Sequence, residues 1–244
     1  MQLTTLPVLL LIIFGLLWYL VRRLYRMGSL RSVEQTWLNV LLAILLAWGG
    51  LVSYQSSQGI LTSQQFLSLL PGYWMPYVVT IFIFVATMLV PSLRSGLRTF
   101  ATMTPMYWLT GIHIVRMLAV GTLIKASLGL FPEKFAWFVG GPDLLFGLSA
   151  VVVTFQVWRG RMSESQVMLW HLTGALVILV PIIGFMHLFM QERLYSALFQ
   201  FPMVLAPALV VPLLVMLNLL SFLQLLEKRV HSTGMAQLGT GRES

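Results

Sequence analysis

The chain contains no cysteine among its 244 residues. This absence excludes disulfides, thiolate nucleophiles, iron–sulfur clusters and the usual structural zinc sites, all of which need cysteine sulfur. Carboxylates and imidazoles are also scarce, with seven Asp and Glu residues and four histidines in total. Any metal or cofactor would have to bind through these few side chains. The sequence does not show whether a metal or a cofactor is bound, or which one.

Charge of either sign is rare as well. Only 9% of the residues are charged and 58% are hydrophobic, with a mean hydropathy of +0.88. Soluble domains carry far more charge than this, so the composition predicts an integral membrane protein whose first partner is the lipid bilayer. Phosphate-binding loops, dinucleotide fingerprints and paired carboxylates are absent, which argues against nucleotide-driven transport and against hydrolysis.

Seven stretches of the sequence are long and apolar enough to cross a bilayer of about 30 Å as helices. They lie at residues 5–21, 37–54, 73–90, 105–130, 142–158, 167–190 and 203–226. The sequence therefore predicts an all-α fold, an integral membrane bundle of seven transmembrane helices. We expect residues 1–230 to form this single domain and residues 231–244 to be a disordered cytoplasmic tail.

The net charge of +8 is distributed along the chain in a pattern typical of membrane topology. Eleven cations follow the odd-numbered stretches, whereas the alternate connections hold two, Lys134 and Arg193. The eleven are Arg22, Arg23, Arg26, Arg31, Arg94, Arg98, Arg159, Arg161, Lys228, Arg229 and Arg242. Because cytoplasmic connections carry the excess of Lys and Arg, the N-terminus is predicted outside and the C-terminus inside, and the basic charge does not indicate nucleic acid binding.

The connections differ between the two sides. Those on the predicted cytoplasmic side look like short, charged hairpins. On the other side, residues 55–72 have an uncharged apolar period that predicts a short interfacial helix. Residues 130–143 are aromatic and bounded by prolines, which predicts a short element set into the outer membrane surface, before a fifth helix that begins at Pro142.

Arg116 lies in the middle of the fourth apolar stretch, about 17 Å from Pro105 at 1.5 Å per residue. An arginine at the bilayer centre costs about 3 to more than 10 kcal/mol, so we expect it to face the bundle interior with a partner or a polar cavity. His113 precedes it by three residues and lies on the same helix face. The two side chains are therefore predicted to form one polar patch, whereas Lys125 is near enough to the helix end to reach the interface.

Asp143 follows Gly140, Gly141 and Pro142. A proline in the first turn and a carboxylate near the positive end of the helix dipole are typical of a helix start at the surface. A short fifth helix could also begin below the surface, and Asp143 would then be a buried charge that pairs with Arg116 or Lys125. The sequence leaves both alternatives open.

His171 is predicted at a depth similar to that of His113, on the sixth helix. Two neutral imidazoles at one depth are the minimum for a six-coordinate haem or a transition-metal site. The simpler interpretation is a hydrogen bond between helices, which we also expect for Asn218. Trp170 is expected to belong to the aromatic belt at the membrane surface.

The last 130 or so residues contain several motifs together. They are Arg116, the turn with Phe131-Pro132 and Phe135-Ala136, the G-x-x-D-x-x-x-G sequence of Gly140, Asp143 and Gly147, the pair Trp170 and Gly174, and the prolines Pro202, Pro207 and Pro212.

In these motifs the chain resembles a group of uncharacterised seven-span bacterial integral membrane proteins. The resemblance implies the seven-helix architecture and a bacterial cytoplasmic (inner) membrane, and no established activity. Members of this group tend to have Asn in place of His171, Asp in place of Val177 and His in place of Asn218, so this chain has a rearranged set of polar residues.

Three functional hypotheses follow. We favour a site inside the bundle that binds a small molecule or ion for transport or sensing, formed by Arg116, His113, His171 and Asp143. One alternative is a haem- or metal-binding membrane oxidoreductase that uses the two histidines. The other is a structural or assembly partner, in a homo-oligomer or with another membrane protein, in which Arg116 and Asp143 fix the helix register. The sequence does not decide whether the protein is an enzyme.

Overall fold

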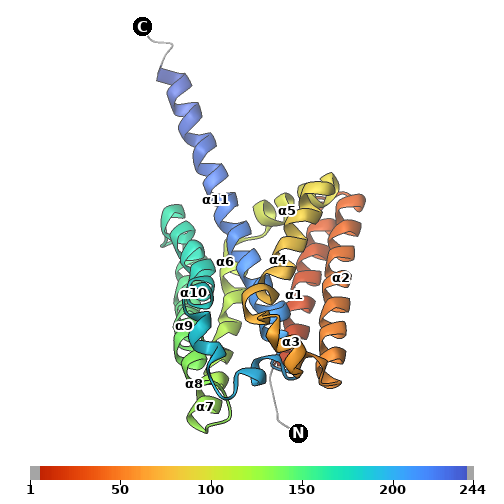
Figure 1. Cartoon of the computed structure of the whole chain (residues 1–244). Helices are drawn as coiled ribbons and strands as arrows, with labels where there is room; N and C mark the ends of the chain where they lie inside the picture. The colour runs from red at the N-terminus through yellow and green to blue at the C-terminus, as the bar shows by residue number, and fades with distance from the viewer. Residues whose placement is uncertain (1–5, 241–244) are drawn as a thin grey trace.

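The computed structural model describes residues 6–240, with side chains described as far as residue 230 (Figure 1). Within this range the chain is helical and has no strand. We call the end of the bundle at which α1 begins the N-side and the end from which α11 emerges the C-side. In Figure 1 the N-side is at the bottom and the C-side at the top.

Seven helical spans in residues 6–230 are long and apolar enough to cross a membrane, so the predicted seven-helix architecture is confirmed. Four are α1 (Leu6–Arg26), α2 (Ser32–Ser57), α4 (Pro71–Leu89) and α10 (Glu164–Met190). The fourth span joins α6 (Met106–Gly111), η2 (Ile112–Ala119) and α7 (Val120–Ser127), and the fifth joins α8 (Glu133–Phe135), η3 (Ala136–Gly140) and α9 (Gly141–Trp158). The seventh joins η5 (Ala206–Val210) and α11 (Val211–Thr240).

Large apolar side chains are exposed on each of the seven spans. Leu11 is 70% exposed, Leu89 75% and Leu145 68%. Apolar surface of this extent is not stable in water and suits contact with lipid. The structure therefore indicates a multi-pass membrane protein.

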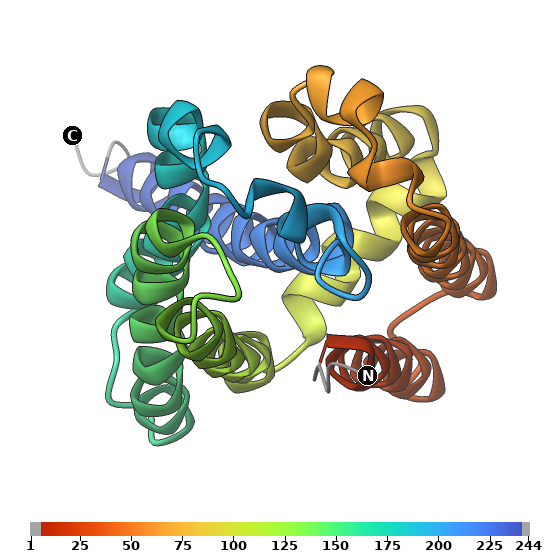
Figure 2. The ribbon, with the colours of Figure 1, turned by 60° about the horizontal axis from the view of Figure 1, so that its bottom comes forward.

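Buried apolar side chains form two clusters on either side of α11. One joins α1, α2 and α4 to α11, through residues such as Leu17, Leu45 and Leu213. The other lies toward the N-side and joins α10 to η5, through residues such as Ile178 and Ala208. Figure 2 shows α11 running through the middle of the bundle, and the seventh span is the most buried of the seven.

The C-side connection between the third and fourth spans is a helix, α5 (Pro91–Met103), rather than the short hairpin that we expected. Leu93, Gly96 and Phe100 are buried along one face of α5. The spacing of i, i+3 and i+7 places an apolar stripe against the bundle and leaves Arg94 and Arg98 exposed. The helix therefore lies against the bundle as an amphipathic surface element.

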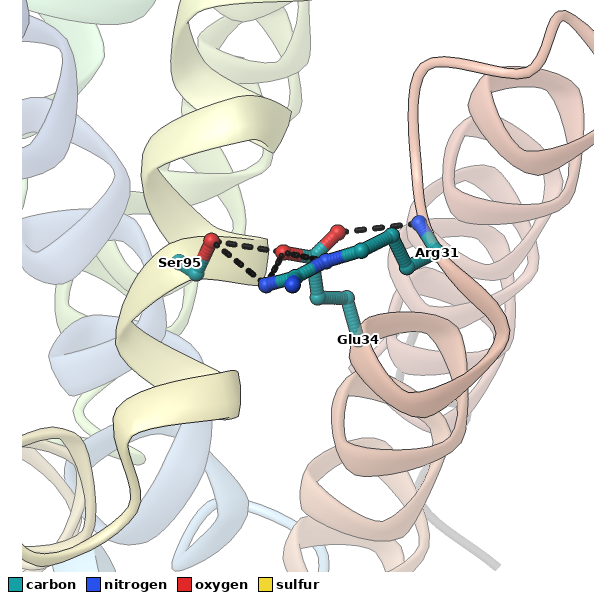
Figure 3. A network of polar contacts seen from close by, with 3 residues as sticks. All are labelled: Arg31, Glu34 and Ser95. Carbon is teal, nitrogen blue, oxygen red and sulfur yellow. Dashed lines mark hydrogen bonds and ion pairs between the residues drawn. The ribbon is translucent and has the colours of Figure 1, made fainter.

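A network of three polar side chains attaches α5 to the start of α2 (Figure 3). The side chain of Glu34 is only 4% exposed. It accepts hydrogen bonds from the Arg31 backbone at 2.9 Å, from Arg31 Nη2 at 2.7 Å and from Ser95 Oγ at 2.6 Å. Through these bonds one carboxylate caps α2 and links it to α5.

Three connections lie on the N-side, and the one between the fourth and fifth spans is short, at residues 128–132. Residues 55–72 contain η1 (Ile60–Thr62) and α3 (Gln64–Ser68), so the predicted interfacial helix is two short helical turns. The third connection contains η4 (Tyr195–Phe199), where Phe199 is buried. The side chains of residues 231–240 and the whole of residues 241–244 lie outside the description. The predicted disorder of residues 231–244 therefore stays a prediction.

The fifth span does not begin at Pro142, as we expected, but at Glu133, and it has 26 residues. The chain passes through Gly140, Gly141 and Pro142 as continuous helix, with the N–H of Gly141 donating to the carbonyl of Ala136 in a π turn. A proline disrupts an α-helix because its ring meets the carbonyl four residues earlier. The wider π turn before Pro142 relieves that contact, so the helix continues.

Candidate functional site

Arg116 lies on η2, where the fourth span winds as a 3₁₀-helix from Ile112 to Ala119. In this tighter helix residues three apart lie directly above one another. His113 and Arg116 therefore share one side, as predicted, and both are buried, with 0% and 2% of their surface exposed. An uninterrupted 3₁₀ segment of eight residues in the middle of a span is uncommon and often marks a functional position.

Arg116 contacts three neighbouring groups on two other spans. Its Nη1 atom lies 3.4 Å from Asp143 Oδ1. Its Nη2 atom donates a hydrogen bond of 3.0 Å to the carbonyl of Gly174, and its guanidinium carbon lies 4.7 Å from the centre of the Phe146 ring. Nε and Nη1 have no hydrogen-bond acceptor among the described residues, although both atoms are buried. Three of the five N–H groups of the guanidinium, one on Nε and two on Nη1, therefore have no acceptor among the described residues.

Asp143 is a buried partner of Arg116 rather than a helix-start residue at the surface. Because the fifth span begins at Glu133, Asp143 lies about 15 Å along it at 1.5 Å per residue. Its side chain is 17% exposed. Because the fifth span is longer than expected, Asp143 lies at the same depth as Arg116. The structure therefore contains the pair of Arg116 and Asp143, which was the second alternative.

Two glycines bring the backbones close enough for these contacts. A Cβ on Gly147 would lie 2.5 Å from the Met117 nitrogen. A Cβ on Gly174 would lie 2.2 Å from Phe146 Cζ and 2.7 Å from Asn218 Nδ2. No larger residue fits at either position without a shift of its neighbours, so the glycines set the spacing around Arg116.

The two predicted histidines come together beside Arg116. The rings of His113 and His171 lie 5.9 Å apart in a T-shaped arrangement, and both residues are fully buried. His171 Nδ1 is 2.9 Å from Asn218 Oδ1, which is the interhelical hydrogen bond expected for both residues. Neither ring nitrogen of His113 has a hydrogen-bond partner among the described residues.

Aromatic rings enclose the histidines. Phe146 and Trp170 stack at 4.4 Å, and the His113 ring lies 6.0 Å from the first and 5.7 Å from the second. Trp170 also donates a hydrogen bond to Ser149 Oγ at 3.0 Å. It therefore packs against the rings of the site, and because part of its surface is exposed, its expected place in the aromatic belt stays a prediction.

A cavity of about 240 Å³ lies on the N-side of Arg116. Arg116, Asp143, Thr122 and Lys125 are the polar side chains that line it, and the other walls are mostly aliphatic and aromatic. His113 and His171 do not line it. The structure thus gathers all four predicted site residues, but only Arg116 and Asp143 reach the cavity.

Three of the cavity walls depart from α-helical geometry. The 3₁₀-helix η2 contributes Val115 and Ala119, the π turn η3 contributes Val139, and the π turn η5 contributes Ala206 and Val210. As Pro142 comes two residues after the end of η3, a proline, Pro212, comes two residues after the end of η5. Such turns concentrate at functional sites because they redirect side chains and free backbone groups.

The side chains that could bind a metal ion or a haem do not form a recognisable ligand group among the described residues. No group of three or more His, Asp or Glu side chains that could hold a metal ion exists among the described residues. The two imidazoles contact each other and the Phe146 and Trp170 rings. The oxidoreductase alternative therefore gains nothing from the geometry and stays a prediction.

Sequence reasoning missed the role of Phe146, which contacts the charge of Arg116 and covers Gly174. It also missed the three altered helical turns. The signal that could have found Phe146 is its place between Asp143 and Gly147, one residue before the glycine against which η2 packs. A cation above an aromatic ring that is shielded from water is worth about 2 kcal/mol.

Neither the curated proteins nor the solved structures contain a match to the chain. A family model does match, over residues 54–226, which is more than half of the chain. This range includes every residue that contacts Arg116. It agrees with the resemblance to an uncharacterised family, since the family model carries no assigned function. The chain belongs to the family described as "Domain of unknown function (DUF8737)".

Proposed function

We propose that this chain is a multi-pass protein of the bacterial inner membrane that binds a small anionic molecule in the cavity beside Arg116, for transport or sensing. Its N-terminus is outside and its C-terminus inside, so the cavity lies in the outer half of the membrane. The anionic group of the ligand binds to Arg116. His113 and His171 pack on the side of Arg116 away from the cavity and do not contact the ligand.

The observation that carries this proposal is the unused hydrogen-bonding capacity of a buried arginine. Arg116 Nη1 and Nε have no acceptor among the described residues, and Arg116 lines the cavity. A buried donor without a partner costs about 1 to 3 kcal/mol, and more when it is charged. An acceptor placed by a ligand would recover this cost.

The charge of the cavity agrees with an anion. Two cations, Arg116 and Lys125, and one carboxylate, Asp143, line it, so one positive charge is in excess. The side-chain ammonium of Lys125 has no ion pair or hydrogen bond within residues 6–230. In a poorly hydrated site this excess favours a ligand with one negative charge.

Binding can be tested by the thermal unfolding of the purified chain in a neutral detergent. Small organic monoanions should raise the unfolding temperature of the natural chain. They should not raise that of the double variant Arg116→Gln, Asp143→Asn, which removes both charges together and so leaves no unpaired ion. Arg159→Gln is the matched control, because Arg159 lies over Phe155 at 4.2 Å on the surface. An equal response of all three proteins would contradict the proposal.

The orientation has its own test, because the chain contains no cysteine. Gln58 on the N-side and Met27 on the C-side are exposed. Each can be replaced by a single cysteine, in the variants Gln58→Cys and Met27→Cys. In intact cells a membrane-impermeant maleimide should label the first and not the second. Labelling in the reverse pattern would invert the proposed topology.

A second candidate, a purely structural role, is favoured by the contacts of Arg116 with two other spans. Through Asp143 and the Gly174 carbonyl the arginine joins the fourth, fifth and sixth spans. If this is its whole role, the charge-free double variant should accumulate poorly. A variant that accumulates and folds normally but binds no anion would instead support the ligand site.

A further inference from the structure

The side of the cavity formed by α10 and the seventh span is an apolar channel. Ile178, Ile182 and Met186 line it from α10, and their spacing of four residues places them in one row along the helix. At 1.5 Å per residue the row is about 12 Å long. Val210 and Leu214 line the cavity from the seventh span. The channel thus runs from Arg116 toward the N-side and offers no polar group along these two walls.

The cavity also reaches the outer, apolar surface of the bundle. Leu118 lines it and is 42% exposed on the lipid-facing side of η2. Leu6 and Leu9 of α1 line it as well. A ligand with an apolar chain could therefore enter between α1 and η2 without crossing a polar surface.

Polar and apolar side chains line different walls of the cavity, because Arg116, Thr122 and Lys125 belong to the fourth span whereas the α10 wall is apolar. Arg116 and Asp143 are at the deep end, whereas Lys125 lies nine residues further along the span, toward the N-side. A compact polar ligand would satisfy Arg116 and leave the channel unfilled. A ligand that matches the whole cavity needs an anionic group beside Arg116 and an aliphatic chain along the α10 wall.

We infer that the ligand is a single-chain aliphatic monoanion of the carboxylate class, bound with its headgroup at Arg116 and its chain along Ile178, Ile182 and Met186. This inference rests on the proposed function, since it names the chemical class of the anion. Arg116 holds the headgroup at the deep end, and Lys125 adds a second positive charge on the same span. The Arg116–Asp143 contact is loose enough at 3.4 Å to admit a carboxylate at the free nitrogen atoms.

The test compares ligands that differ in one part only. Decanoate has both headgroup and chain, acetate has the headgroup alone, and decanol has the chain alone. Binding is measured by calorimetric titration on the full chain in lipid nanodiscs, with empty nanodiscs subtracted. Decanoate should bind at least about a hundredfold more tightly than acetate, because each methylene that it removes from water strengthens binding. It should also bind at least about tenfold more tightly than decanol.

Two variants locate the binding. Gly121 lines the cavity, and a Cβ on it would meet nothing within 4 Å, so Gly121→Leu is expected to add side-chain atoms at the cavity wall. We expect it to weaken decanoate binding about tenfold or more. Gly184→Leu is the matched control, since Gly184 has equal space and does not line the cavity. The double variant Arg116→Gln, Asp143→Asn should bind decanoate no better than decanol.

The outcomes separate this inference from the proposed function. If acetate and decanoate bind equally and both depend on Arg116, the anion site stands and the chain inference is wrong. If decanol binds as tightly as decanoate and Arg116 makes no difference, both are wrong. Unchanged decanoate binding in Gly121→Leu would place the chain elsewhere and overturn the inference. Palmitate supplied in the nanodisc bilayer, compared with decanoate supplied in water, distinguishes a lipid-borne source from a dissolved one, and binding of either supports the inference.

Discussion

The backbone of Gly147 in α9 lies so close to that of Arg116 in η2 that a Cβ on the glycine would be 2.8 Å from the Arg116 carbonyl carbon. This approach holds the 3₁₀ segment against the fifth span. It also places Asp143, one helical turn earlier on α9, beside the guanidinium group. The position of the charge pair therefore depends on the absence of a side chain at residue 147.

Gly147→Ala should destabilise the protein by about 1 to 3 kcal/mol, because the added methyl group forces a backbone shift in a packed interface. Thermal unfolding in detergent would show this as a lower unfolding temperature. Gly141→Ala is the control, since a Cβ on Gly141 meets nothing within 4 Å. Equal unfolding temperatures for the two variants would mean that η2 is free to move away.

Asp143→Asn should destabilise the protein by about 3 to 5 kcal/mol, because it leaves the buried charge of Arg116 without a counter-ion. Adding Arg116→Gln to Asp143→Asn should recover a large part of this loss. The measurement is a double-mutant cycle of unfolding free energies in mixed micelles. Additive losses would indicate that the two groups do not interact, in spite of their separation of 3.4 Å.

The sequence was sufficient for the seven spans and for the face shared by His113 and Arg116, because both follow from local properties. Hydrophobic length predicts a span without knowledge of its neighbours. Likewise, a spacing of three residues places two side chains on one face of an α-helix or a 3₁₀-helix. These predictions did not depend on which helices meet.

The start of the fifth span could not be predicted from the sequence, because a glycine near it is required by a contact with another span and not by a helix end. Gly140, Gly141 and Pro142 have the composition of a helix start. In the structure a Cβ on Gly140 would lie 2.6 Å from Thr122 Oγ1, so that glycine allows α7 to approach. This approach of α7 to η3 is a contact between spans, which no local pattern encodes.

Ser95→Ala should cost about 0.5 to 1.5 kcal/mol, because it removes one hydrogen bond to the buried Glu34 carboxylate. Glu34→Ala should cost more, since it also removes the cap of α2 and both bonds from the Arg31 side chain. Chemical unfolding in detergent would rank the two. Ser57→Ala is the control, because Ser57 is exposed and bonds only within its own helix. A loss for Ser95→Ala no greater than that for Ser57→Ala would show that α5 is held by its apolar face alone.

His171 and Asn218 are hydrogen-bonded at 2.9 Å, and the group of proteins that this chain resembles tends to have the same two residue types in exchanged positions. An imidazole and an amide can form this hydrogen bond whichever of the two positions holds the imidazole. Two imidazoles together are larger than this pair and two amides are smaller, so neither combination fills the same space. We therefore expect His171→Asn and Asn218→His each to lower stability, and the exchanged double variant to recover part of the loss.

The coupling energy of this pair should be about 0.5 to 3 kcal/mol, the range found for residues in contact. Unfolding free energies of the natural chain, both single variants and the double variant would give it directly. Trp170 fluorescence reports whether the ring cluster around His171 keeps its packing, since the two rings lie 5.0 Å apart. A double variant as unstable as the sum of its singles would show that the bond can exist in one arrangement only, and that the rest of the site has adapted to it.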